Sequence, residues 1–591
     1  MFPLITPTYF GFPPFFSHAF AKTAAKNGPP NIRCESKPAG DSVPTRKQTP
    51  ELKFDRRGFL LLGFGSSGIY NTVSTEKPLS PDFVNCGDAV RPDGRPIDCC
   101  PDPGSPPSSS DVSDFVPPTA AAPTRRVRSA AQTAAGAAAL AKYTKAVELM
   151  KKLPADDPRS FRQQADVHCA YCDGAYAQRG FPDLRFEIHE SWLFFPFHRW
   201  YLYFFERICA RLLDDDAFAL PFWNWDGPSG MEIPAPFAIP GSPLHDRRRD
   251  RSHLPPAVAD LNWDGSPTGL SPEKQRYYNL SVMYKQMVNN GVTPRLFMGQ
   301  PFKAGDDISL INGAGSIETA PHNTIHVWTG DPREPNGENM GVFYSAARDP
   351  IFYTHHANID RLWTIWADKL GGKVFTDPDW LETSFVFYNE DKKPVRVKTK
   401  DCLDLSRLGY AYQEIETPWL NAKPKPRLRE VRVRSPDDVI TDDRDFPREL
   451  NESLNIVVKR RPSRKMSSSE KENINYENEE EVLVIEITEY NIGRHVKFDV
   501  YVNEDDVESC MPDSTEFLGS FVSVPRGGHD DDDVVVTSAR GAQRFGLSNV
   551  VAELGVEEDE VLMVTLVPRT GCAGLTVGGV RIEFDASGSG P

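Results

Sequence analysis

Apolar side chains recur with helical spacing between residues 349 and 366. Asp349 suits the N-cap position and Pro350 the first helical position, so a helix is predicted to begin there. Its apolar face is formed by Phe352, His356, Ile359, Trp363 and Trp366. The predicted helix therefore carries His356 on its buried face, with His355 about a quarter-turn away.

Two more helices are predicted in the first third of the chain. Ser129 is the predicted N-cap of an Ala- and Lys-rich amphipathic helix that runs to about Leu153. A second helix starts after Pro158 and carries His168. Cys172 follows one turn later and faces the same way.

A strongly aromatic stretch, residues 181–211, contains two further histidines. Pro196 disfavours helical geometry in the residue before it and suits a first turn, so a helix begins there with His198 near its start. His189 precedes this helix on a loop. Aromatic stripes are more often core than site, so the aromatic residues alone do not indicate function.

The segment PHNTIHVWTG, residues 321–330, places two histidines four positions apart. On a helix His322 and His326 project from one face and can share one metal ion. A histidine on an apolar face is more often a hydrogen-bonded core residue. The second histidine group of the chain makes a metal site the favoured interpretation.

The C-terminal region changes to short alternating apolar runs. Residues 482–591 contain VLVIEIT, VKFDVYV and VLMVTLV between Gly, Asp and Asn turns, which predicts an antiparallel β-sandwich. Residues 422–481 are rich in Pro, charge and Ser and are interpreted as a linker. Within it, KRRPSRK (459–465) is a predicted protease target.

Composition narrows the possible partners. The chain has 591 residues, enough for two or more domains, and a formal net charge of -16. This charge argues against nucleic acid or an anionic membrane as partner. No apolar run approaches the length of a transmembrane helix.

The N-terminal 76 residues are interpreted as targeting sequence. The first 34 residues contain no Asp or Glu, which is typical of an organellar transit peptide. Arg56 and Arg57, followed by a short apolar run, fit a twin-arginine export signal. Together they predict import into the chloroplast thylakoid lumen. The alternative is a disordered tail.

Cysteines cluster in a loop with little apolar periodicity. Cys86, Cys99 and Cys100 lie there, and Cys169 is the natural fourth partner for disulfides, which could persist in the lumen. A zinc knuckle competes with this interpretation, but the spacing lacks the usual CxxC pair. Cys169 and Cys172 form a CxxC without the strand-turn-helix pattern of a redox site.

The type of metal follows from the ligands. Two groups of three imidazoles without a matching carboxylate disfavour di-iron, di-manganese, magnesium and calcium sites, which leaves copper and zinc. A dizinc hydrolase would normally add a bridging carboxylate, and none is evident. His245 and His253 are predicted to lie on a solvated loop, and His495 and His529 have no partner at ligand spacing.

With these motifs the chain resembles the plant polyphenol oxidases, the catechol oxidase and tyrosinase family with a type 3 dicopper centre. Further matches are Asp379-Trp380-Leu381, the pair Tyr410 and Tyr412, and KFDV at 497–500. The resemblance implies a mainly α catalytic domain, residues 77–421, with a four-helix bundle around two copper ions. It also implies a C-terminal β-sandwich that shields the copper site in a latent proenzyme, which a protease activates.

The resemblance also implies roles for individual residues. The first copper would be bound by His168, His189 and His198, and the second by His322, His326 and His356. Cys172 would form a thioether bond to His189, and the disulfides would be Cys86–Cys100 and Cys99–Cys169. Phe343 would be the aromatic gate over the second copper, and Asp360 would orient ligand imidazoles by hydrogen bonding.

Glu318 and Asn323 match positions that hold a water thought to take the proton of a monophenol. Val327 is a neighbouring position expected to tune the same balance. Asn323 could also simply hydrogen-bond locally. The predicted activity is oxidation of ortho-diphenols to ortho-quinones with reduction of dioxygen to water. The alternative is a haemocyanin-like carrier that binds dioxygen reversibly and keeps phenols out.

Overall fold

The computed structural model describes most of the chain after residue 77. The described residues are 78–101, 111–118, 125–311, 313–427, 439–441, 443–460, 479–531, 534–536 and 538–586. All of them belong to one compact unit, Ser74–Pro591. The predicted targeting segment, residues 1–76, lies outside the described residues.

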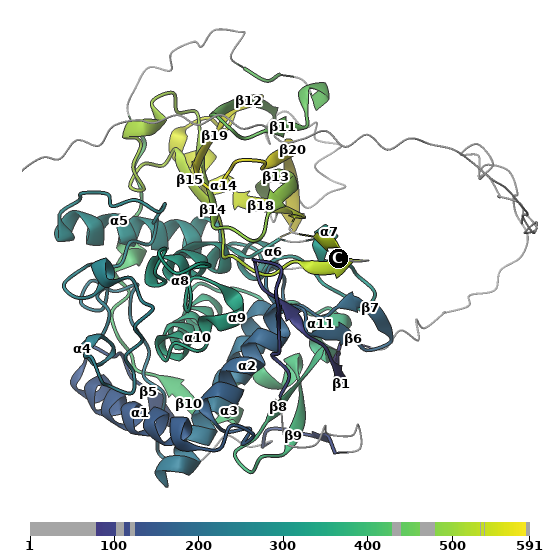
Figure 1. Ribbon diagram of the computed structural model, residues 1–591. Coiled ribbons are helices and arrows are strands. Elements are labelled where there is room, and N and C mark those ends of the chain that lie inside the picture. Colours follow the sequence, from purple (N-terminus) through teal and green to yellow (C-terminus); the bar gives the residue numbers. More distant parts are fainter. Residues whose placement is uncertain are drawn as a thin grey trace, which may run out of the picture. The chain divides into compact units, whose positions relative to one another are not determined.

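Helices form the part of the molecule that carries the histidines (Figure 1). Among them are α1 (Ala134–Lys152), α2 (Phe161–Cys172), α3 (Phe194–Leu213), η3 (Glu318–His322), α8 (Asn323–Thr329), α9 (Phe343–Ala346) and α10 (Ile351–Lys369). Most side chains of α3 are buried, as expected of a helix that is apolar on nearly all sides. The aromatic stretch of the sequence therefore forms core.

The first helix begins later than its sequence predicts. Thr133, not Ser129, is the N-cap of α1, and its hydroxyl accepts the backbone N–H of Gly136 at 3.1 Å. Ser129 still belongs to extended chain, because the next residue, Ala130, forms a parallel β-bridge with Phe222. Long-range pairing thus overrides a favourable local cap. The helix ends at Lys152, close to the predicted Leu153.

A short parallel pair joins the two ends of the helical part. β5 (Arg126–Arg128) pairs with β10 (Tyr410–Tyr412), with Arg126 opposite Tyr410 and Arg128 opposite Tyr412. Arg128 and Tyr412 lie 284 positions apart along the chain, so the pairing fastens the start of the helical part to its end.

Two disulfides hold the N-terminal described segment. Cys86 is bonded to Cys100 and Cys99 to Cys169, with Cα atoms 5.8 and 5.5 Å apart. This is the pairing that the family resemblance implies. The second bond fixes the segment to α2, one residue from His168.

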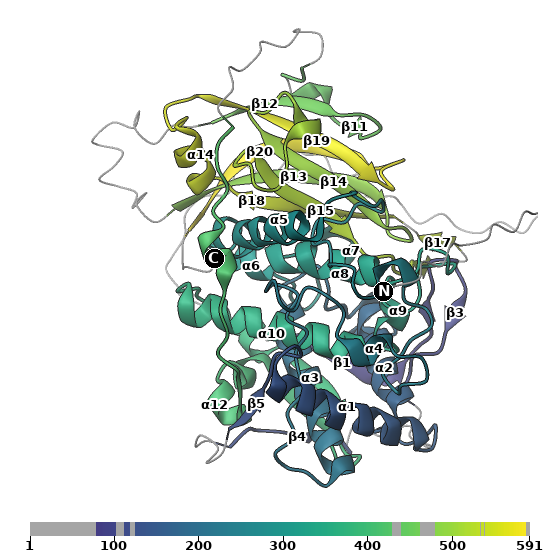
Figure 2. The same ribbon diagram turned by 90° about the vertical axis from the view of Figure 1, so that its left-hand side faces the viewer.

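Two four-stranded antiparallel sheets form most of the C-terminal part (Figure 2). One has the order β11-β20-β13-β18 and the other β12-β19-β14-β15. Their bounds are β11 (Arg448–Glu449), β12 (Leu454–Lys459), β13 (Glu479–Asn491), β14 (Val496–Val502), β15 (Phe517–Ser523), β18 (Ser538–Gly546), β19 (Val561–Thr570) and β20 (Thr576–Ala586). The predicted linker is therefore not uniformly irregular, because β11 and β12 lie inside it and supply one strand to each sheet.

The helical and C-terminal parts have separate hydrophobic cores. One core extends from Leu79 to Trp419 and includes Val524 from the C-terminal part. The other is formed by both C-terminal sheets, with Leu483, Phe498 and Val564 among its members. A mainly helical part followed by antiparallel sheets agrees with the coarse prediction from sequence.

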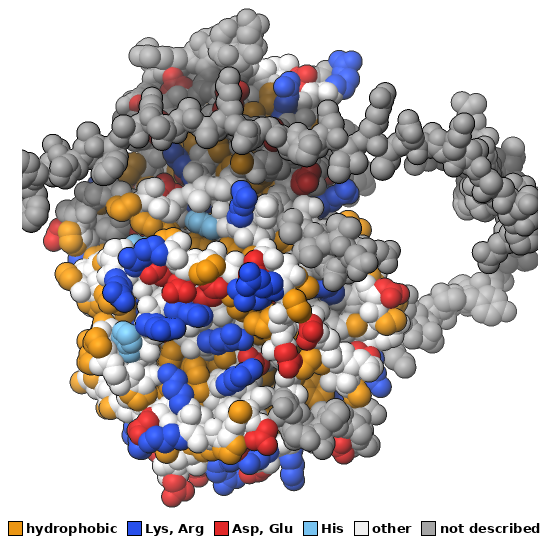
Figure 3. All heavy atoms as spheres, viewed as in Figure 1, with side chains coloured by type: hydrophobic (Ala, Val, Ile, Leu, Met, Phe, Trp, Pro, Cys, Tyr) orange, Lys and Arg blue, Asp and Glu red, His pale blue; other side chains and the backbone are white. Residues whose placement is uncertain are grey.

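Charged side chains are mixed over the visible surface. On the face drawn in Figure 3, Lys and Arg side chains lie among Asp, Glu and hydrophobic side chains. The net negative charge of the chain therefore does not form a uniform acidic coat on this face. Within the described ranges, no helix combines the length and the apolarity that crossing a bilayer requires.

Candidate metal centre

Three elements bring the first group of histidines together. His168 lies on α2, His189 on the loop before α3 and His198 on α3, as predicted. Their ring centroids are 5.4 to 5.7 Å apart, and none of the three is more than 2% exposed. The sequence prediction thus correctly groups residues from two helices and a loop.

The second group lies at the junction of η3 and α8 and on α10. The ring centroids of His322 and His326 are 4.5 Å apart, and those of His322 and His356 are 4.9 Å apart. The Nε2 atoms of His326 and His356 approach to 3.4 Å. All three side chains are completely buried.

The two groups share a boundary. The rings of His198 and His356 stack with centroids 4.0 Å apart and an interplanar angle of 13°. His189 and His322 also face each other, at 6.0 Å. Six imidazoles from distant segments therefore converge on one buried region.

Hydrogen bonds fix the orientation of four of these rings. The Nδ1 atoms of His168, His198 and His326 lie 2.8 to 3.1 Å from the carbonyl oxygens of Phe343, Phe194 and Met340. Nδ1 of His322 lies 3.3 Å from the carbonyl oxygen of Glu318 and 2.9 Å from the Asn323 side-chain oxygen. A proton on Nδ1 leaves the Nε2 lone pair free.

The donor set fits a metal. The Nε2 atoms of His168, His189, His198 and His322 are buried without a hydrogen-bond partner. Burial lowers the pKa of His198 to about 3 and that of His326 to about 4, and lowers those of the other four as well. Neutral imidazoles with inward lone pairs are the form that binds metal ions.

His355 lies closer to the centre than the sequence predicts. Its ring stacks on His322 at 5.3 Å and lies 5.1 Å from His326, and it joins the second group of potential ligands. Its Nδ1, however, accepts the indole N–H of Trp225 at 3.0 Å. The proton of neutral His355 then sits on Nε2, which removes that lone pair from metal binding.

Cys172 lies beside the first group. Its Sγ and one ligand atom each of His168 and His189 lie within 4.8 Å of one another. Cys172 is buried and is not in a disulfide. This proximity suits the thioether bond that the resemblance implies, which stays a prediction.

The predicted gate and water-binding residues surround the histidines. The ring of Phe343 stacks on that of His189, with centroids 3.9 Å apart and an angle of 9°. Glu318 accepts the backbone N–H of Glu190 at 2.6 Å, and its other oxygen is buried without a partner. Burial raises the pKa of Glu318 well above its ordinary value. Asn323 donates its amide N–H to the carbonyl oxygen of Val522.

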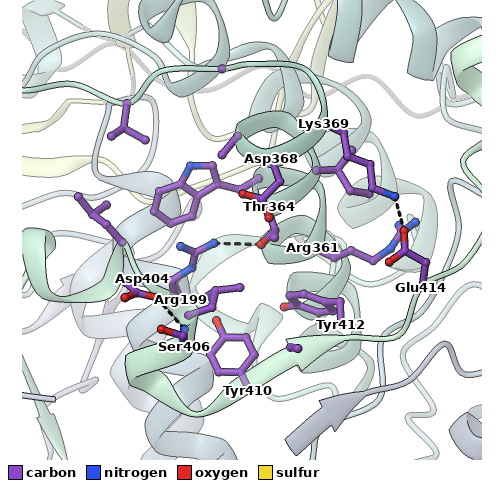
Figure 4. A pocket seen from close by; sticks show the side chains of 18 of the residues that line it. Arg199, Arg361, Thr364, Asp368, Lys369, Asp404, Ser406, Tyr410, Tyr412 and Glu414 are labelled. Carbon is purple, nitrogen blue, oxygen red and sulfur yellow. Dashed lines mark hydrogen bonds and ion pairs between the residues drawn. The ribbon is translucent and has the colours of Figure 1, made fainter. Parts of the chain in front are cut away.

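Asp360 does not bind a ligand imidazole, in contrast to the prediction. Its carboxylate accepts hydrogen bonds from Arg128, Arg199, Tyr410 and Tyr412 at 2.5 to 3.2 Å. Three of these partners line an open pocket of about 900 Å³ (Figure 4). Asp360 thus fixes α10, which carries His356 one turn earlier, and acts on the centre through the helix.

The C-terminal part meets the helical part beside the histidines. The backbone N–H of Phe343 donates to the carbonyl oxygen of Pro525 at 3.1 Å. Arg526 forms an ion pair with Glu190 at 2.7 Å, and Tyr490 donates to the same carboxylate. We call the region of the C-terminal part around these contacts the shield; it comprises β13, β15 and residues 524–527.

Sequence reasoning missed several of these positions. Glu190, Trp225 and Arg526 carry no motif of their own, and only their neighbours in the fold give them a role. His253 is not on a solvated loop, because it is 9% exposed and its ring stacks on Trp328 at 4.5 Å.

Three family models match consecutive parts of the chain. The common central domain of tyrosinase matches residues 158–369, the polyphenol oxidase middle domain residues 375–425, and the chloroplastic polyphenol oxidase C-terminal domain residues 446–584. The helical part with its two histidine groups is accordingly a tyrosinase-type domain.

Whole-chain relatives narrow this class. A chloroplastic polyphenol oxidase of Malus domestica is 47% identical over 90% of both chains, and one of Vitis vinifera is 44% identical over 97% of this chain and 95% of its own. The solved structure of latent apple tyrosinase covers 80% of this chain and 100% of its own, with 48% identity and a TM-score of 0.73. The chain belongs to the plant polyphenol oxidase family.

Proposed function

We propose that the protein oxidises ortho-diphenols to ortho-quinones and reduces dioxygen to water. Two diphenols give up four electrons and four protons, which convert one dioxygen to two waters. The observation that carries this proposal is the convergence of six neutral, buried imidazoles in two groups. Relatives named polyphenol oxidase in Malus domestica and catechol oxidase B in Solanum tuberosum support it.

The cofactor that fits this donor set is a pair of copper ions. His168, His189 and His198 would hold one, and His322, His326 and His356 the other, with the helices α2, α3, α8 and α10 as the bundle around them. We choose His356 over His355 because Trp225 occupies Nδ1 of His355. The coppers, when bound, supply the electron exchange between diphenol and dioxygen.

The chain itself supplies orientation and a dry pocket. Backbone carbonyls fix four imidazole rings, so their lone pairs point inward before a metal binds. Phe343 covers the face of His189, as expected of an aromatic gate. Glu318 and Asn323 would hold the water that takes the proton of a monophenol once the Asn323 amide is released from Val522.

We further propose that the described form is latent. The shield occupies the backbone of Phe343, the amide of Asn323 and the carboxylate of Glu190. A protease that cuts the 422–481 segment before β11 would release it, because β11 and β12 belong to the C-terminal sheets. A solved structure of latent aurone synthase, 40% identical over 86% of this chain with a TM-score of 0.78, supports this interpretation.

The site of action is proposed to be the thylakoid lumen. Curated relatives are named chloroplastic. The acid-poor first 34 residues and the following Arg56-Arg57 pair support onward transport into the lumen.

Oxygen uptake tests the proposed reaction. The uncut and cut proteins would be compared with methylcatechol and with tyramine, and copper would be measured in the same samples. Quinone formation by the cut protein supports the oxidase. Dioxygen that is bound reversibly without quinone formation would instead support a carrier, which the names of the relatives do not favour.

A further inference from the structure

Glu190 is the first residue after His189, a proposed copper ligand, and its carboxylate faces the shield. Its φ angle is 58°, in the left-handed region that few non-glycine residues adopt. Its carboxylate does not contact a ligand. It is held instead by two groups of the shield, the Arg526 guanidinium at 2.7 Å and the Tyr490 hydroxyl at 3.1 Å.

Glu190 belongs to a group of acidic residues that we call the acidic rim. Its members are Asp173, Glu187, Glu190 and Glu318, all from the helical part and all buried. Arg526 interacts electrostatically with each of them. The backbone N–H of Gly527, the next residue, donates to Asp173 at 3.1 Å. The shield thus places one cation and one N–H donor against these acidic side chains.

The rim borders the same space as the residues that flank the second histidine group. A small cavity between the helical part and the shield is lined by Glu190, Thr319 and Asn323 on one side and by Tyr490, Phe521 and Val522 on the other. Asn323 follows ligand His322. Removal of the shield takes away one wall of this cavity and both hydrogen-bonding partners of the Glu190 carboxylate.

We propose that, in the shield-free protein, Glu190 binds the ammonium group of catechols that carry an aminoalkyl tail. The substrate amine would take the place of the Arg526 guanidinium, so the preferred substrates are cationic catechols. Glu190 and Asn323, the residue after His322, line the same small cavity, so the carboxylate lies beside the space next to the histidines that a substrate tail would enter. This inference rests on the proposed diphenol oxidation and on release of the shield.

Opposite charges at the mouth of a site raise capture of one substrate class and reject the other. Neutral catechols gain nothing from the rim. The preference should therefore appear in kcat/KM, chiefly through KM, and should weaken as salt increases.

The test compares three diphenols with the protein cut in the linker, whose helical part has its own core. They are dopamine (cationic), methylcatechol (neutral) and hydrocaffeate (anionic). For Glu190→Gln we expect kcat/KM for dopamine to fall about fivefold, that for hydrocaffeate to rise, and that for methylcatechol to stay within about twofold. Glu190→Asp, which keeps the charge, should retain most of the preference.

A matched control separates a local contact from the overall field. Glu414→Gln removes the same charge at a position that is 86% exposed and is paired with Lys369. It should leave all three substrates unchanged. Binding of phenylethylammonium to the metal-free cut protein gives a readout without turnover, and its affinity should fall in Glu190→Gln by a similar factor.

Two outcomes overturn the proposal in different ways. If the ratio of dopamine to hydrocaffeate is the same in the wild type and in Glu190→Gln, the specificity inference is wrong while the oxidase stands. If the cut wild type oxidises no diphenol, the proposed function itself fails, and the binding experiment alone then decides whether Glu190 recognises the ammonium group.

Discussion

Replacement of Arg526 by Met in the full-length, uncut protein should release latency. Arg526 is 9% exposed and Glu190 11%, and their atoms are 2.7 Å apart. Removing one partner of a buried ion pair costs about 3 to 5 kcal/mol, because the other charge stays buried and uncompensated. In the closed form the shield covers Glu190, whereas in the open form the shield has left and Glu190 is hydrated. The cost therefore destabilises only the closed form.

Because the cost applies only to the closed form, it sets the expected shift between closed and open protein. A shift of about 3 kcal/mol changes the ratio of closed to open protein roughly a hundredfold. The contacts of Val522 with Asn323 and of Pro525 with Phe343 remain, so the shield is weakened rather than lost. Oxygen uptake by the uncut variant with methylcatechol should rise well above that of uncut wild type.

Two comparisons make the result interpretable. The cut Arg526→Met protein should match the cut wild type, because Arg526 leaves with the shield. Arg581→Met replaces an arginine that is 48% exposed and pairs with Glu486 within the C-terminal sheets, and it should stay latent. If uncut Arg526→Met were as inactive as uncut wild type, the ion pair would not hold the shield, and the reasoning above would be refuted.

Three further changes test the centre and its support. His356→Ala should bind one copper ion fewer than wild type by metal analysis, whereas His355→Ala should keep both; the reverse result would exchange their roles. Mass spectrometry of digested holoprotein should recover the Cys172 and His189 peptides covalently joined, and two separate peptides would exclude the thioether. Asp360→Asn should lower the free energy of unfolding by about 3 kcal/mol or more, measured by denaturant titration. Burial alone would raise the pKa of Asp360, but its two arginine partners lower this pKa below the ordinary value. The contribution of Asp360 to the free energy of unfolding is therefore fully present above the ordinary pKa and is lost as the pH falls through the lowered pKa. A wild-type stability that is unaffected by acid in that range would contradict this.

Local spacing is enough to group several of the proposed ligands. His322 and His326 are four positions apart, and His356 lies on an apolar face, so elementary helix geometry groups them. His168 and Cys172 follow the same rule on α2. His189 lies on a loop without helical periodicity, and its place in the first histidine group together with the family resemblance makes it a proposed ligand.

Positions that depend on distant parts of the chain could not be predicted in this way. The partners of Asp360 come from β5, α3 and β10, and no local pattern joins these segments. The same holds for Ser129, which long-range pairing keeps out of α1, and for His355, whose role depends on the indole of Trp225.

The sequence predicts that the C-terminal β-sandwich begins at residue 482, whereas in the structure its strands begin earlier, for a related reason. The segment around Leu454–Lys459 stands in a charged, proline-rich context, which favoured a linker. It becomes a strand because β19 offers a partner along its whole length. The amino-acid composition of a segment does not show whether a distant strand will pair with it.

The parallel pairing of β5 with β10 has a practical consequence for maturation. Because β5 and β10 join the start of the helical part to its last strand, proteolytic removal of the residues beyond 421 would leave both ends of the helical part paired. For the same reason, a position just after β10 is suitable for a new chain end in a truncated or circularly permuted enzyme.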